Sequence, residues 1–234
     1  MNDKRPFMDH LSELNKRFLI VIISFAIATV PSWIFYENII DYISNPLSKI
    51  GYSDENLVIH NITEPLQVKL YVVFFVSLYI VLPILVFNIT SFLIPAVNVK
   101  FKKISWVLTF LSILLFYYGA YFGYVNIYHG LKFFISLTDL TVGLRSQYYI
   151  QFLFRFIFLI GLFFQFPIVV AFVIMNGLIS SKYLITKRKE IFMSILVIAA
   201  VITPTGDPFS LFLFSIPTYL MFELTVLLMK KRFD

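Results

Sequence analysis

The stretch LQVKLYVVFFVSLYIVLPILVFNITSFLI, residues 66–94, carries one charged side chain, Lys69 near its start. A helix that crosses about 30 Å of hydrocarbon at about 1.5 Å per residue needs about 20 mostly apolar residues. The stretch is longer than that, so it predicts a membrane-spanning helix. An integral membrane protein is therefore expected, and the rest of the chain can be tested against that class.

The composition of the whole chain agrees with this class. Of the 234 residues, 59% are hydrophobic and 14% are charged, and the mean hydropathy is +0.86. Soluble domains are about 45–50% apolar and about 25% charged. The composition therefore excludes an ordinary soluble domain and a disordered chain. The absence of cysteine excludes disulfides, thiolate metal sites and cysteine nucleophiles.

Six apolar segments predict an all-α integral membrane protein with one membrane domain over residues 1–234. The expected spans are 18–36, 66–94, 104–128, 150–175, 191–202 and 209–229. The fifth span would reach only about 18 Å, so we expect a helical hairpin with a short first arm, turning at 204–208. We expect kinks at the prolines that lie within four of the spans, Pro31, Pro83, Pro167 and Pro217.

The charge distribution predicts the orientation. Basic residues cluster before the first span, in 95–103, in 176–190 and after the last span, and together these segments hold 14 of the 19. The segment 37–65 has one basic residue against five acidic ones. The positive-inside rule then places both termini on the cytoplasmic side or its organellar equivalent. The net charge of +6 is thus an orientation signal, and no nucleic-acid partner is expected.

We single out three polar side chains within the predicted spans as functional candidates, because such groups are costly at membrane depth. Arg155 either binds a partner or extends its guanidinium towards the nearer membrane surface. Gln165, two residues before Pro167, either docks a partner or forms an interhelical hydrogen bond. Glu223 either handles protons or is a structural carboxylate near Lys230 and Lys231.

Gly119 and Gly123 in the third span form a G-x-x-x-G pattern, which allows two helices to approach closely. In a chain with several spans, we expect this pattern to serve internal packing rather than dimerisation.

Several kinds of chemistry are excluded by missing residues. None of the three histidines lies within a span, and the chain has no H-E-x-x-H motif, no pair of intramembrane aspartates and no P-loop. We therefore expect a non-enzymatic membrane component without a cofactor or a metal site. Energy would come from partners or from the transmembrane ion gradient.

The segment His10-Leu11-Ser12-Glu13-Leu14-Asn15-Lys16-Arg17 resembles the H-L-x-E-L-x-x-R motif of the TatC family, the polytopic receptors of the twin-arginine protein translocase. Further segments resemble other motifs of that family, in the same order along the chain. They are Asn45-Pro46-Leu47, Thr63-Glu64-Pro65, Phe92 to Pro95, Ser112 to Tyr124 with Gly119, Phe164-Gln165-Phe166-Pro167, Thr203 to Ser210 with Pro204 and Asp207, and Ile216-Pro217 to Glu223.

The resemblance implies a signal-peptide receptor that exports folded proteins across an energy-transducing membrane by the proton-motive force. It implies single-span partner subunits of the TatA and TatB type, membrane lipids, and a homo-oligomer within a hetero-complex. The membrane would be the bacterial inner membrane, the mitochondrial inner membrane or the thylakoid. The residues that it implies for signal-peptide binding are His10, Leu11, Glu13, Arg17 and Phe101. Phe101 and Asn15 stand where the family has a glutamate and an arginine.

Two other functions remain open. The first is a secondary transporter of a small solute, in which Arg155, Gln165 and Glu223 form an intramembrane polar site. The second is a structural subunit of a respiratory complex, which the absence of histidines from the spans disfavours.

Overall fold

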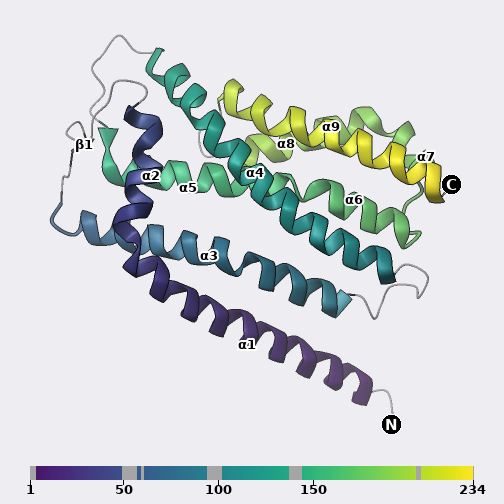
Figure 1. The fold of residues 1–234 in the computed structure, drawn as a ribbon. Helices are drawn as coiled ribbons and strands as arrows, with labels where there is room; N and C mark the ends of the chain where they lie inside the picture. The colour runs from purple at the N-terminus through teal and green to yellow at the C-terminus, as the bar shows by residue number, and fades with distance from the viewer. Residues whose placement is uncertain are drawn as a thin grey trace.

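The computed structural model describes residues 4–48, 57–58, 61–93, 102–136, 144–203 and 207–233 (Figure 1). Helices dominate these residues. In chain order the elements are α1 (Lys4–Ile34), α2 (Tyr36–Ser48), β1 (Leu57–Val58), α3 (Glu64–Leu93), α4 (Lys102–Ser136), β2 (Leu144–Arg145), α5 (Ser146–Phe163), α6 (Phe166–Met175), α7 (Ser181–Thr186), α8 (Arg188–Ile202) and α9 (Pro208–Phe233).

Five helical segments of the described chain are long and apolar enough to cross a membrane. They are Ser12–Ile34, Glu64–Leu93, Lys102–Phe133, Ser146–Met175 and Pro208–Lys230. The expected short fifth span corresponds to α8, whose 15 residues reach about 22 Å. Helix α8 packs against α9, as expected for a helical hairpin, and the two chain termini lie at the same end of the molecule (Figure 1). The all-α class is confirmed, with one small addition, a parallel pairing of β1 with β2.

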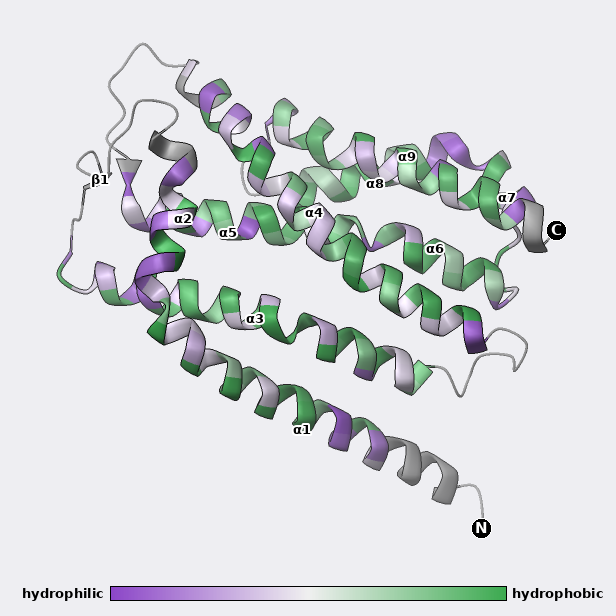
Figure 2. Ribbon diagram, viewed as in Figure 1, coloured by the Kyte–Doolittle hydropathy of each residue, from purple (hydrophilic) through white to green (hydrophobic). Residues whose placement is uncertain are grey.

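Polar residues gather at the ends of the helices. Figure 2 shows hydrophobic residues along most of α3, α5 and α6, and hydrophilic ones at the start of α4 and around α7. We call the end with both termini and α7 the α7 end, and the opposite end, with α2 and the starts of α3 and α5, the α2 end (Figure 1).

Pro167 interrupts its span, because it has no backbone N–H to donate to the preceding turn. Helix α5 ends at Phe163, and α6 begins at Phe166 with the proline in its first turn. Pro31 lies four residues before the turn at Phe35 that separates α1 from α2. Helices α3 and α9 continue without a break through Pro83 and Pro217.

Helix α2 was not predicted, because the hydropathy analysis assigned residues 37–65 to a loop. The helix is amphipathic: Glu37 and Asp41 are exposed, whereas Ile43 packs into the main core. The hydroxyl of Tyr124 on α4 donates to the carbonyl of Tyr42 at 2.8 Å. These contacts attach the segment after the first span to the rest of the bundle.

The main core lies where α3, α4, α5 and α9 meet, and includes Val72, Ile127, Leu153 and Phe214, each at most 1% exposed. Helix α4 packs closely on α5 and on the residues that follow it. A Cβ atom on Gly119 would lie 2.7 Å from Cγ of Phe164. One on Gly123 would lie 3.1 Å from Cδ1 of Ile160. The glycine pattern thus serves internal packing, as expected.

Candidate functional site

Glu13 lies in the first turns of α1 and is bound by Arg17 from the next turn of the same helix. The Arg17 Nη2 and Nε atoms donate to Oε1 of Glu13 at 2.6 and 3.0 Å. The Glu13 side chain remains 40% exposed and that of Arg17 25%. The site therefore holds an accessible carboxylate, one oxygen of which already accepts two donors of a guanidinium through charge-assisted hydrogen bonds.

The other residues expected around Glu13 are only partly described. His10 and Leu11 lie within α1, but their side chains are outside the described residues, as is all of Phe101. Lys16, Lys102 and Lys103 are exposed at the same end of the molecule. This end is therefore basic around the Glu13 carboxylate.

Gln165 lies at the break between α5 and α6 and is bound to α4 on both sides of its amide. Its Nε2 donates to the backbone carbonyl of Ser112 at 3.0 Å, and the Ser112 hydroxyl donates to its Oε1. The interhelical hydrogen bond expected for Gln165 is therefore present. Gln165 is the residue immediately before the first turn of α6.

Gln165 and Ser112 also line an open groove of about 480 Å³ between α3, α4, α5 and α6. The other lining residues are mostly leucine, isoleucine, valine and phenylalanine. The groove can accept an apolar segment, and its polar lining consists of the Gln165 amide and the hydroxyl-bearing residues Thr90, Ser105, Thr109 and Ser112.

The other two intramembrane candidates lie apart from this groove. Glu223 on α9 accepts from Nη2 of Arg188 at 2.7 Å and from the hydroxyl of Tyr219 at 2.9 Å. Nε of Arg155 on α5 donates to the hydroxyl of Tyr71 on α3 at 3.1 Å. Because Arg155, Gln165 and Glu223 each have their own partner, the structure does not bring them together into one polar site.

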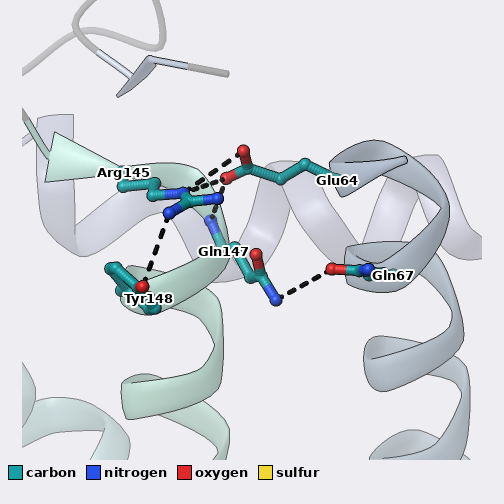
Figure 3. Close-up of polar contacts among 5 residues, drawn as sticks. All are labelled: Glu64, Gln67, Arg145, Gln147 and Tyr148. Atoms are coloured by element: carbon teal, nitrogen blue, oxygen red, sulfur yellow. Dashed lines mark hydrogen bonds and ion pairs between the residues drawn. The ribbon is translucent and has the colours of Figure 1, made fainter. Parts of the chain in front are cut away.

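At the α2 end, Glu64 on α3 is 1% exposed and is held by residues that precede and begin α5 (Figure 3). Nε of Arg145 lies 3.2 Å from its Oε1, and the backbone N–H of Gln147 donates to the same oxygen at 3.3 Å. Arg145 was not singled out from the sequence. The sequence offered one signal for this ion pair: Glu64 and Arg145 have opposite charges and lie in segments expected at the same end of the molecule.

Comparison with known proteins decides the family. The family model described as "Sec-independent protein translocase protein (TatC)" matches residues 9–217. The chain belongs to the TatC family. The TatC protein of Aquifex aeolicus is 31% identical over 230 residues, covering 96% of this chain and 95% of its own length. That of Koribacter versatilis is 28% identical over 225 residues, covering 94% of this chain and 83% of its own.

A solved TatC structure has the same fold. The crystal structure of a twin-arginine translocase receptor, TatC, in the detergent DDM superposes with a TM-score of 0.80 at 30% identity. It covers 94% of this chain and 98% of that one. This chain is therefore an integral, multi-pass membrane protein of a bacterial inner membrane or an organellar equivalent. It is a component of a Tat translocase complex and not an enzyme, and no comparison supports a solute transporter.

The residues that carry the TatC resemblance have mainly structural positions where the structure describes them. Pro65 is the second residue of α3 and is exposed, and Pro217 lies within α9. Oδ1 of Asp207 accepts the backbone N–H of Ser210 at 2.8 Å, as an N-cap of α9 does. Pro95 and Pro204 lie outside the described residues, as does the side chain of Pro46 in α2.

The described residues of this TatC-family chain contain no group of three or more side chains that could hold a metal ion. The site offers hydrogen-bonding groups, charged side chains and apolar surface. Such a site can bind and release a polypeptide segment without covalent chemistry.

Proposed function

We propose that this TatC-family chain, acting as one membrane domain over residues 1–234, is the signal-peptide receptor and core subunit of its translocase. It binds the twin-arginine signal peptides of folded cargo proteins and exports the cargo by the proton-motive force. Both termini lie on the cytoplasmic side, and six segments cross the membrane, with α8 the short one. Copies of the chain assemble with single-span subunits of the TatA and TatB type.

The Glu13 carboxylate supports this proposal most directly. It lies on α1 ahead of the apolar run that begins at Phe18, at the end of the molecule that carries exposed lysines. It is 40% exposed and binds the guanidinium of Arg17. A signal-peptide arginine presents the same donor group to it, and a planar guanidinium matches a carboxylate better than a lysine ammonium does. His10, Leu11, Arg17 and Phe101 complete the proposed binding surface.

Site-specific photocrosslinking tests the receptor function. A photoreactive residue replaces Leu14, which is 46% exposed, so that Glu13 is retained, and a second variant carries it at Phe101. Each is exposed to a twin-arginine precursor and to its twin-lysine variant. We expect strong labelling of the first precursor, weak labelling of the second, and loss of the difference in Glu13→Gln.

A photoreactive residue at Tyr148, which is 62% exposed at the α2 end, is the matched control and should label neither precursor. Equal labelling of both precursors from positions 14 and 101 contradicts the receptor function.

We further propose that the groove beside Gln165 docks an apolar helix, either of a single-span subunit or of the signal peptide. The supporting observation is a groove of about 480 Å³ whose polar lining includes the amide of Gln165 and the hydroxyl of Ser112. A photoreactive residue at Val169, a lining residue that is 57% exposed, identifies which helix binds. Transport at the wild-type rate in Gln165→Leu would argue against this role.

A further inference from the structure

A second groove, between α1 and α3, has no part in the proposed receptor site. It has a volume of about 640 Å³ and is lined almost entirely by apolar side chains. Phe25 of α1 and Phe74 of α3 line it, with ring centroids 5.4 Å apart. The hydroxyl of Thr29, which also lines it, donates to the carbonyl of Ala26 at 2.6 Å. The Thr29 hydroxyl is therefore already hydrogen-bonded, and the groove presents an apolar surface to whatever binds there.

Lys69 lies beside this groove and has no carboxylate partner in the described part of the chain. Its Nζ lies 4.6 Å from the ring centroid of Trp33 and 4.9 Å from that of Tyr36. The rings hold the ammonium in place by cation–π attraction but do not neutralise it. Glu37 and Asp41, the acidic residues of the adjacent α2, form no ion pair with it.

Lys69 and Trp33 lie near the helix ends at the α2 end, where the lipid headgroups of a membrane would be. Lys69 is five residues into α3, or about 7 Å along the helix, and Trp33 is next to the last residue of α1. Tryptophan, tyrosine and lysine side chains gather at the level of lipid headgroups. From Trp33 the groove extends to Phe25, about 12 Å deeper along α1. The cation thus stands at headgroup level, above an apolar groove that faces the acyl region.

We propose that this groove binds an anionic phospholipid from the leaflet at the α2 end. The headgroup phosphate lies against Lys69, and an acyl chain lies along the groove beside Phe25, Trp33 and Phe74. The charge of Lys69 favours an anionic lipid over an apolar helix, because a helix would leave the Lys69 ammonium without a counter-ion. A zwitterionic lipid would bring a second cation to rings that already hold one.

Trp33 lines the groove and reports its occupant. The chain has two tryptophans, so Trp106→Phe leaves Trp33 as the sole strong fluorophore. The full chain is reconstituted in phosphatidylcholine vesicles that contain a minor fraction of either phosphatidylglycerol or phosphatidylcholine with brominated acyl chains. Bromine quenches tryptophan on contact, so the ratio of quenching by the two lipids measures selection at the groove.

We expect brominated phosphatidylglycerol to be enriched at Trp33 about fivefold over brominated phosphatidylcholine. This factor corresponds to the attraction of one lysine to an anionic lipid surface. Lys69→Gln should reduce this ratio to about one, and Lys69→Arg should preserve it. The control is Lys132→Gln, which removes an exposed lysine from α4 at the same end and should leave the ratio unchanged.

Three results overturn the proposal. Equal quenching by the two lipids in the parent shows that Lys69 selects no headgroup. Absence of quenching by either lipid shows that protein covers the groove, either a partner helix or a second copy of the chain. An equal loss of selection in Lys132→Gln and Lys69→Gln shows that the effect comes from general surface charge.

Discussion

Arg145 binds the buried carboxylate of Glu64 across two segments that are 81 residues apart in the sequence. Its Nε lies 3.2 Å from Oε1 and 3.3 Å from Oε2, and the Glu64 side chain is 1% exposed against 24% for Arg145. Nε2 of Gln147 donates to Oε1 of Gln67 at 3.0 Å beside this pair (Figure 3). The start of α3 is thereby fixed to the start of α5.

Removing the arginine should destabilise the protein. Arg145→Met removes the Arg145 guanidinium from the buried Glu64 carboxylate. We expect a loss of about 2 kcal/mol in the free energy of unfolding, less than for a fully buried pair because Arg145 is partly exposed. Thermal unfolding in detergent measures the effect. The double variant Glu64→Leu with Arg145→Met should regain most of the stability. Additive losses would contradict the pairing.

Enlarging Gly119 should also destabilise the protein. The Cβ atom of Gly119→Ala would lie 2.7 Å from Cγ of Phe164, so α4 and the ring must separate, at a cost of about 1–3 kcal/mol. Gly130→Ala is the control, because its nearest contact is the flexible Phe209 ring at 3.2 Å. Comparable melting temperatures for the two variants would refute close packing at Gly119.

The two ion pairs at the start of α8 should differ in strength. Glu223 is 21% exposed and also accepts from Tyr219, so Glu223→Gln should cost about 1 kcal/mol. The neighbouring Glu190 and Lys187 are 59% and 44% exposed, and Glu190→Gln should have no measurable effect on thermal unfolding. Similar losses for the two variants would show that exposure does not set the strength of these pairs.

The same exposed pair should make no measurable contribution to the pH dependence of stability. A hydrogen bond from Lys187 lowers the pKa of Glu190 from its ordinary value. Its contribution to stability is therefore present above the pKa of the unfolded chain and is lost as the pH falls through the lowered pKa. We expect the acid side of a stability–pH profile to be unchanged in Glu190→Gln, because water screens a pair this exposed. A shifted acid limb would contradict this.

Arg17 should compete with a signal peptide for Glu13. Because Arg17 binds the Glu13 carboxylate, Arg17→Gln removes a competing guanidinium, and we expect labelling of a twin-arginine precursor from position 14 to rise about twofold. Lys16→Gln removes a neighbouring exposed charge for which no ion pair with Glu13 is seen, and is the matched control. Weaker labelling in Arg17→Gln than in Lys16→Gln would instead make Arg17 a direct contact of the peptide.

Hydropathy and charge were sufficient to predict most of the helical framework. Apolar runs locate α1, α3, α4 and α9 because the cost of leaving backbone groups unpaired in lipid permits only helices there. Helix α2 was missed since it lies outside the long apolar runs and is defined by contacts such as that between Tyr124 and Tyr42. The break at Gln165 was expected only as a proline kink, because local sequence does not determine whether a helix bends or restarts.

In the candidate site, contacts between residues close in the sequence could be predicted, and contacts between distant segments could not. The pairing of Glu13 with Arg17 follows from their spacing of four residues on one helix. Gln165 is bound by Ser112 and Glu64 by Arg145. These pairings depend on which distant segments pack together, and local sequence patterns do not reveal that. The same holds for the ring contacts of Lys69, which join α1 to α3.

The separation of Glu64 from Arg145 has a consequence for biogenesis. A ribosome that adds about 5–20 residues per second reaches Arg145 roughly 4–16 s after Glu64. During that interval the Glu64 carboxylate has no Arg145 to bind, and its place at the first residue of α3 lets it wait in water at the membrane surface. This ion pair can therefore fix the α2 end only after the segment that precedes α5 has been made.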